Sequence, residues 1–173
     1  MLRDAGLSFA QVDPPFDDPP QPRGGEMSPE QTACELARSK ALSLRAADLP
    51  ARCAGAVVIP ADTLIVQEDG SLAGTPIDPD EAMRMLKAHV GAEHHVVTGV
   101  ALLRLDDREL DVWADRAAVA WGQVSDQQLE QYVATGGWRG KAGGYNLFER
   151  TDAGWPIRVR GLQSTVVGLP LEQ

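Results

Sequence analysis

The chain has 173 residues, a length that predicts one domain spanning 1–173. Its net charge of −9 argues against a surface that binds a nucleic-acid backbone, although a nucleotide needs only a few local cations. No apolar run approaches the roughly 20 residues of a membrane span, and the N-terminus has no signal-peptide pattern. We therefore predict a soluble, cytoplasmic protein with neither nucleic acid nor membrane as partner. Cys34 and Cys53 lack metal-ligand spacing and are interpreted as free thiols.

The first third of the chain contains a loop, a helix and an interrupted strand. Met1 to Phe9 has the pattern of a helix end closed by glycine, and the proline-rich stretch Asp13 to Glu26 predicts a surface loop. A serine cap followed by proline starts a helix at Ser28, with apolar residues at helical spacing as far as Leu44. The β-branched run 57–66 predicts a strand interrupted near Pro60, followed by a tight turn.

The remainder predicts two more capped helices and two pairs of strands. In order, these are a helix from Asp78 to Gly91, strands His95–Leu105 and Leu110–Trp121 as an antiparallel pair, a helix from Ser125 to Thr135, a glycine-rich loop from Gly136 to Tyr145, and short strands at Ile157–Arg160 and Thr165–Val167. Capped helices combined with parallel-looking and hairpin strands predict an α/β domain with a mixed β-sheet and flanking helices.

Asp62 is the first candidate for chemistry, because it places a carboxylate inside an apolar strand. Burying that charge without a partner would cost on the order of several kcal/mol of folding free energy. One interpretation is an aspartate at a strand end that caps a backbone amide. The other is a metal ligand or general base at a ligand-binding edge of the sheet.

Two lysines and three histidines are weaker candidates. Lys40, taken alone, has the pattern of a solvated helix residue, whereas Lys141 lies among glycines whose exposed amides suit a phosphate. The loop is not a P-loop, since its spacing and its Ser/Thr are missing. His89, His94 and His95 have no neighbouring ligands at useful spacing, which argues against zinc.

Several motifs, taken in order, resemble the Maf (septum-formation inhibitor) family over nearly the whole chain. They are Leu36-Ala37-x-x-Lys40-Ala41, Ala61-Asp62-Thr63, Pro76-x-Asp78-x-x-Glu81-Ala82-x-x-Met85-Leu86, Gly91-x-x-His94-x-Val96-x-Thr98-Gly99-Val100, Tyr132-Val133-x-Thr135-Gly136, Lys141-Ala142-Gly143-x-Tyr145 and Val166-Val167-Gly168-Leu169-Pro170-Leu171. The resemblance implies a fold similar to that of inosine triphosphatases. It also implies hydrolysis of a nucleoside triphosphate to the monophosphate and pyrophosphate with a divalent cation, Mg²⁺ or Mn²⁺.

The resemblance assigns expected roles to individual residues. Asp62 matches the family's catalytic base and a metal ligand, and Asp18 falls where the family has a glutamate near the metal. Lys40 and Lys141 match cations that neutralise phosphate charge, and Thr63 matches a position linked to substrate choice.

The chain departs from the family pattern at three places. The Ser-x-Ser-Pro-Arg-Arg loop, whose arginines are expected to hold the triphosphate, would precede Leu2. Thr75 replaces a lysine, and Phe148 replaces a glutamine that helps set pyrimidine preference, so we expect weak discrimination among bases. Three readings stay open: an active pyrophosphatase on canonical or modified nucleotides, a catalytically silent nucleotide-binding or regulatory protein, and a protein whose translation starts upstream. The sequence also leaves a homodimer open.

Overall fold

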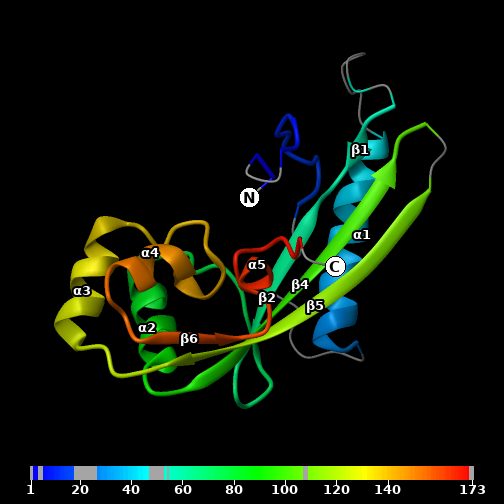
Figure 1. Cartoon of the computed structure of the whole chain (residues 1–173). Coiled ribbons are helices and arrows are strands. Elements are labelled where there is room, and N and C mark those ends of the chain that lie inside the picture. Colours follow the sequence, from blue (N-terminus) through cyan, green and yellow to red (C-terminus); the bar gives the residue numbers. More distant parts are fainter. Residues whose placement is uncertain are drawn as a thin grey trace.

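The computed structural model describes residues 2–3, 6–17, 27–46, 53, 55–106 and 109–171. Figure 1 shows a long, twisted sheet with helices on both faces and at one end. The strands are β1 (Val57–Val58), β2 (Ala61–Val66), β3 (Leu72–Ala73), β4 (Glu93–Arg104), β5 (Leu110–Trp121) and β6 (Ile157–Arg160). The helices are α1 (Pro29–Ala46), α2 (Pro79–His89), α3 (Asp126–Thr135), the 3₁₀ turn η2 (Ala142–Gly144), α4 (Leu147–Asp152) and α5 (Gln163–Val166).

The sheet is built around the hairpin of β4 and β5. The strand order is β3-β2-β4-β5-β6. Strand β1 also pairs with β4, so β1 and β2 both pair with β4, at different positions along it. The α/β class with flanking helices is confirmed. Every pairing among the described strands is antiparallel, whereas the sequence predicts a mixed sheet.

Helix α1 lies against one face of the sheet because its inner face is made of alanines. Its start carries the predicted cap: the Ser28 hydroxyl accepts from the Gln31 backbone N–H, and the Gln31 side chain accepts from that of Ser28. The fully buried alanines at four-residue spacing are Ala33, Ala37 and Ala41. A Cβ at Gly99 of β4 would lie 2.2 Å from the Ala33 carbonyl carbon. Glycine and alanine therefore let the helix backbone touch the sheet.

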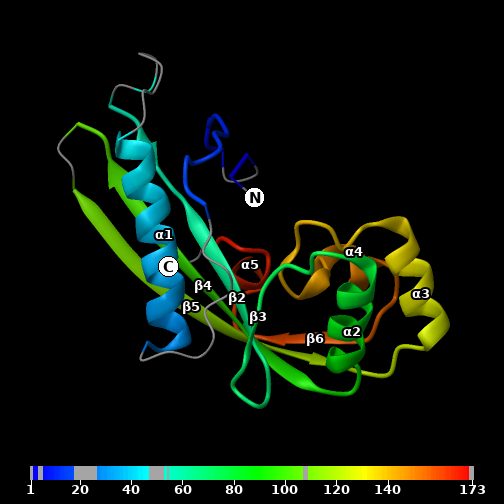
Figure 2. The same cartoon turned by 180° about the vertical axis from the view of Figure 1, so that it is seen from behind.

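The other helices form a second lobe at the far end of the β4–β5 hairpin. Figure 2, seen from behind, shows α1 in front of the strands and α2, α3 and α4 gathered beyond them. The interior of that lobe is aromatic, with Trp121 packed edge-on against Tyr145 and Trp155. Trp121, Trp138 and Trp155 are buried there and pack the interior of the lobe.

Three segments differ from the predicted elements. Thr165–Val167 is not a strand: residues 163–166 form the short helix α5, because the chain turns back over the sheet there. Helix α4 was not predicted, although Asn146 caps it through the Glu149 backbone N–H. Among the described residues before Ser28, there is a glycine-closed turn at Gly6 and no helix. None of the helices in the described ranges combines the length and apolar character that crossing a membrane requires.

Candidate active site

Strand β2 carries candidate residues on both faces of the sheet. Leu64 and Val66 pack with Ala33 of α1, so Asp62, which shares their alternation, faces α1. Thr63 points to the opposite face, where its hydroxyl lies 2.9 Å from that of Thr98. Neighbouring residues of the sequence thus serve two different surfaces.

On the α1 face, Lys40 and Asp62 form an ion pair. The Lys40 ammonium donates to Asp62 Oδ1 at 2.6 Å, and the two side chains are only 14% and 11% exposed. Lys40 reaches the strand because it follows Ala37 on the helix side that packs closest to the sheet. The two candidates that the sequence separates by 22 positions are therefore in direct contact.

On the opposite face lies a cavity of about 300 Å³. Its walls come from β2, the glycine-rich loop, the start of α4 and the end of α5: Thr63, Ile65, Gly140, Lys141, Ala142, Tyr145, Asn146, Leu147, Val166, Val167 and Gly168. The volume is at the lower end of the range for small-molecule sites, which is about 300–1,000 Å³. Figure 1 shows α5 in front of β2 and β4, on the face away from α1.

Lys141 lies at this cavity, where the glycine-rich loop holds its ammonium. Lys141 Nζ donates to the Gly137 carbonyl at 2.6 Å and lies 3.8 Å from a carboxylate oxygen of Glu149. Gly143 follows with φ +68°, a conformation that favours glycine. The structure therefore brings Lys141 together with Thr63, and Lys40 together with Asp62.

The two surfaces meet at one edge of β2. Strand β3 pairs only with Ile65 and Val66, whereas β4 pairs with β2 from Ala61 to Val66. Among the described strands, residues 61–64 thus have a ladder partner on one side only. Asp62 and Thr63 both lie in this stretch of β2, on opposite faces of the sheet.

A buried histidine pair supports the glycine-rich loop. His89 Nε2 lies 3.3 Å from the Gly143 carbonyl, and His94 Nε2 lies 2.9 Å from the Tyr145 hydroxyl. Because a carbonyl only accepts, His89 carries its proton on Nε2. Burial lowers the pKa of His89 to about 4 and that of His94 to about 3, where the neighbouring His89 adds to the effect. Both rings are therefore neutral near pH 7 and act as packing and positioning groups.

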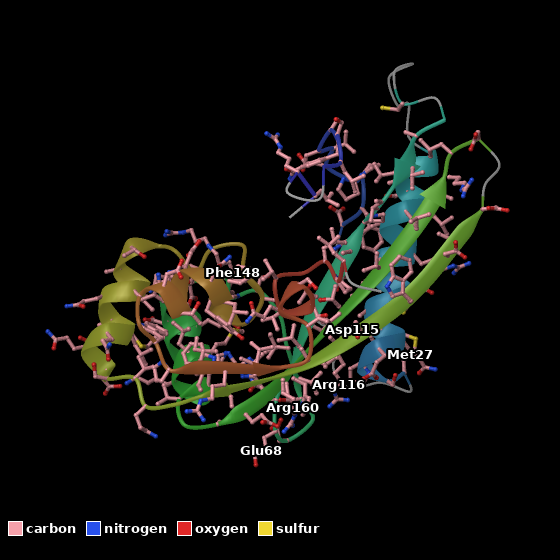
Figure 3. The ribbon with its side chains drawn as sticks, viewed as in Figure 1. Met27, Glu68, Asp115, Arg116, Phe148 and Arg160 are labelled. Atoms are coloured by element: carbon pink, nitrogen blue, oxygen red, sulfur yellow. The ribbon has the colours of Figure 1, made fainter. Side chains whose placement is uncertain are left out.

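The remaining predicted residues do not line the cavity or lie outside the described part. Phe148 of α4, labelled in Figure 3, is 44% exposed, and it is its neighbour Leu147 that lines the cavity. Asp18 lies outside the described residues. Within the described ranges, no group of three or more His, Cys, Asp and Glu side chains is positioned to hold a metal ion.

Several residues at the cavity were given no functional role from the sequence. Asn146, Val166, Val167 and Gly168 line the cavity, and the Thr98 hydroxyl lies 2.9 Å from that of Thr63. The motif Val166-Val167-Gly168 contains three of them, the motif that ends in Thr98-Gly99-Val100 contains Thr98, and Asn146 directly follows the motif that ends at Tyr145. The collinear presence of these motifs was the available signal, but nothing in their spacing reveals that they meet at one cavity.

Comparison with known proteins finds similar sequences over the whole chain. The family model described as Maf-like protein matches residues 1–173. A protein named dTTP/UTP pyrophosphatase from Symbiobacterium thermophilum is 37% identical over 173 residues, covering 100% of this chain and 83% of the relative. Proteins of the same name from Salinibacter ruber and Pelotomaculum thermopropionicum are 34% and 33% identical, covering 94% and 99% of this chain and 79% and 84% of the relatives.

Proposed function

This chain belongs to the Maf-like protein family, and we propose that it hydrolyses nucleoside triphosphates to the monophosphate and pyrophosphate. The observation that carries this proposal is the Lys40–Asp62 ion pair beside the open edge of β2, next to a cavity that contains Lys141. The chain aligns with most of the length of relatives that are named dTTP/UTP pyrophosphatase, and these names support pyrophosphate-releasing hydrolysis.

The arrangement supplies a base and two cations. Asp62 is the proposed base: its carboxylate takes a proton from water as the water oxygen bonds to the α-phosphorus. The bond between that phosphorus and the bridging oxygen breaks, and pyrophosphate leaves with the electron pair. Lys40 holds the Asp62 carboxylate through Oδ1, and both lysines offset phosphate charge.

The Asp62 carboxylate fits a divalent cation that is held jointly by the protein and the substrate phosphates. Mg²⁺ is usually bound by one or two carboxylates together with phosphate oxygens and water, and Asp62 supplies one carboxylate. We propose Asp62 and Asp18 as the residues that would hold Mg²⁺ or Mn²⁺. When bound, the cation would neutralise phosphate charge. We propose that the protein acts in the cytoplasm.

The test is product analysis with a panel of canonical triphosphates and Mg²⁺. We expect equal amounts of monophosphate and pyrophosphate, with activity lost on chelation by EDTA and restored by Mg²⁺. Formation of diphosphate and inorganic phosphate instead would contradict the proposal. Binding of nucleotides without any turnover would favour the silent nucleotide-binding alternative.

A further inference from the structure

The ammonium of Lys141 has two neighbours of different kinds, a neutral carbonyl and a charged carboxylate. Lys141 Nζ donates to the Gly137 carbonyl at 2.6 Å, and Glu149 Oε1 lies 3.8 Å from the same nitrogen. The first contact is a short hydrogen bond, whereas the second exceeds the range of about 2.7–3.2 Å within which a nitrogen donates to an oxygen. Gly137 therefore fixes where the ammonium lies, and Glu149 acts on it through charge alone.

The loop keeps the Gly137 carbonyl in place without help from Glu149. The next residue, Trp138, is buried, and its indole Nε1–H donates to the Val133 carbonyl of α3 at 3.1 Å. The Trp138 carbonyl in turn accepts from the Lys141 backbone N–H at 3.2 Å. Both the backbone and the side chain of Lys141 are thus held by the loop itself. Removal of the Glu149 charge should therefore leave Lys141 in position.

Helix α4 holds Glu149 next to the loop that carries Lys141 (Figure 1). The following residue, Arg150, places its guanidinium over the rings of Tyr132 and Trp155, 4.1 Å and 5.1 Å from their centroids. Arg150 therefore packs against the interior of the lobe and does not neutralise its neighbour. Among the described residues, Lys141 is the only cation within ion-pair distance of the Glu149 carboxylate.

A carboxylate in this place opposes the binding of an anion. Lys141 lines the cavity, so an anion that approaches its ammonium also approaches Glu149. The attraction from one charge and the repulsion from the other then act over similar distances and partly cancel. The repulsion grows with the charge of the ligand. A free nucleoside triphosphate carries about twice the negative charge of its complex with a divalent cation, which neutralises part of the phosphate charge.

We propose that Glu149 is a specificity-determining residue that weakens the binding of anions at Lys141 in proportion to their charge. It thereby favours a nucleotide complexed with a divalent cation over the free nucleotide. The inference rests on the proposed function of this cavity, and it concerns the charge of the ligand, not its base. Since Glu149 makes no hydrogen bond to Lys141, its charge is the property that matters, and its exact length is secondary.

The experiment is calorimetry with α,β-imido-UTP, once in EDTA and once in excess Mg²⁺. We expect Glu149→Gln to bind the free analogue about tenfold more tightly than wild type and the Mg²⁺ complex about threefold more tightly, because halving the ligand charge halves the repulsion energy. Glu149→Asp keeps the charge and should stay within about twofold of wild type. The gain in Glu149→Gln should shrink between about 50 and 500 mM salt, since salt screens charges that solvent reaches.

Asp152→Asn is the matched control, because it makes the same change in net charge on the same helix. Asp152 is exposed and forms no ion pair with Lys141, so both affinities should stay within about twofold of wild type. Equal gains from Asp152→Asn and Glu149→Gln, or equal gains for the free and the complexed analogue, would overturn the inference.

Weaker binding by Glu149→Gln would also overturn it, since Glu149 would then hold Lys141 in place for the phosphates. The measurement does not depend on turnover. If none of the proteins hydrolyses UTP, the proposed function fails, whereas a charge-dependent gain in Glu149→Gln still upholds the inference. Absence of binding in every variant would overturn the inference.

Discussion

Asp62 is the residue on which the proposed chemistry depends most. Its carboxylate contacts Lys40 at 2.6 Å and is largely shielded from water. Asp62→Asn keeps the shape but removes the base, so we expect pyrophosphate release to fall by about 10²–10⁴-fold, the usual contribution of a general base. A malachite-green assay coupled to inorganic pyrophosphatase measures this.

The matched control for that variant is Asp111→Asn, an exposed carboxylate on β5. It should retain wild-type activity. Circular dichroism melting should show that Asp62→Asn remains folded, because the amide still accepts from Lys40. An active Asp62→Asn protein with unchanged stability would remove Asp62 from the mechanism.

At the scale of elements, the contact between α1 and β4 places Lys40 against Asp62. Gly99 is directly opposite Asp62 in the ladder, and α1 lies on top of it. Gly99→Ala should force the helix away from the sheet, lowering the free energy of unfolding by about 3 kcal/mol, at the upper end for overpacking, and lowering activity as Lys40 moves.

Gly154→Ala is the reference for that experiment. Gly154 has φ +80° and no atom within 4 Å of an added Cβ, so it reports backbone strain without a clash. We expect it to cost about 1–2 kcal/mol and to leave activity unchanged. Equal losses from the two variants in urea denaturation would show that the α1 contact is not tight.

Local signals in the sequence predict the helices and long strands well. The caps at Ser28, Asp78 and Ser125 each start a helix within one residue, because capping is a short-range interaction. The strand 110–121 is predicted with its exact bounds. Helix α5 was missed because its β-branched residues favour a strand, and its contacts with Thr98 and Asp115 are long-range.

The candidate site can be predicted only in part from the sequence, because some of its contacts are long-range. Asp62 stands out as a charge in an apolar run, and its contact with Lys40 agrees with the expectation that it needs a partner. Alternation along β2 predicts that Asp62 and Thr63 face opposite ways. Nothing local predicts that Lys141 and Gly168 meet at Thr63, since that depends on how two distant loops fold over the sheet.

For the whole molecule, the neutral histidine pair predicts loss of stability in acid. Their pKa values fall from 6.5 to about 4 and about 3, so the unfolded chain binds more protons than the folded one below pH 6.5. The stabilisation is fully present above pH 6.5 and is lost as the pH falls toward 4 and 3. Over that window each histidine contributes on the order of 3 kcal/mol. The groups around His89 are His94, Trp121, Tyr145 and the Gly143 carbonyl, none of them a carboxylate.

Melting temperature measured from pH 7.5 to 4 checks this prediction. The wild-type protein should lose stability steeply below pH 6.5. His94→Gln should be less stable at pH 7.5 but should show a shallower decline. His95→Gln is the control, because His95 is only partly buried and its variant should retain the wild-type slope. Parallel curves for wild type and His94→Gln would contradict the prediction.

The most direct test of the whole account is the position of the bond that water breaks. Hydrolysis of UTP in H₂¹⁸O with Mg²⁺, followed by ³¹P NMR and mass spectrometry, shows which product carries the new oxygen. Attack at the α-phosphorus, with Asp62 as the base beside Lys40, predicts one ¹⁸O atom in UMP and none in pyrophosphate. Label in pyrophosphate, or in inorganic phosphate released together with UDP, would contradict the account.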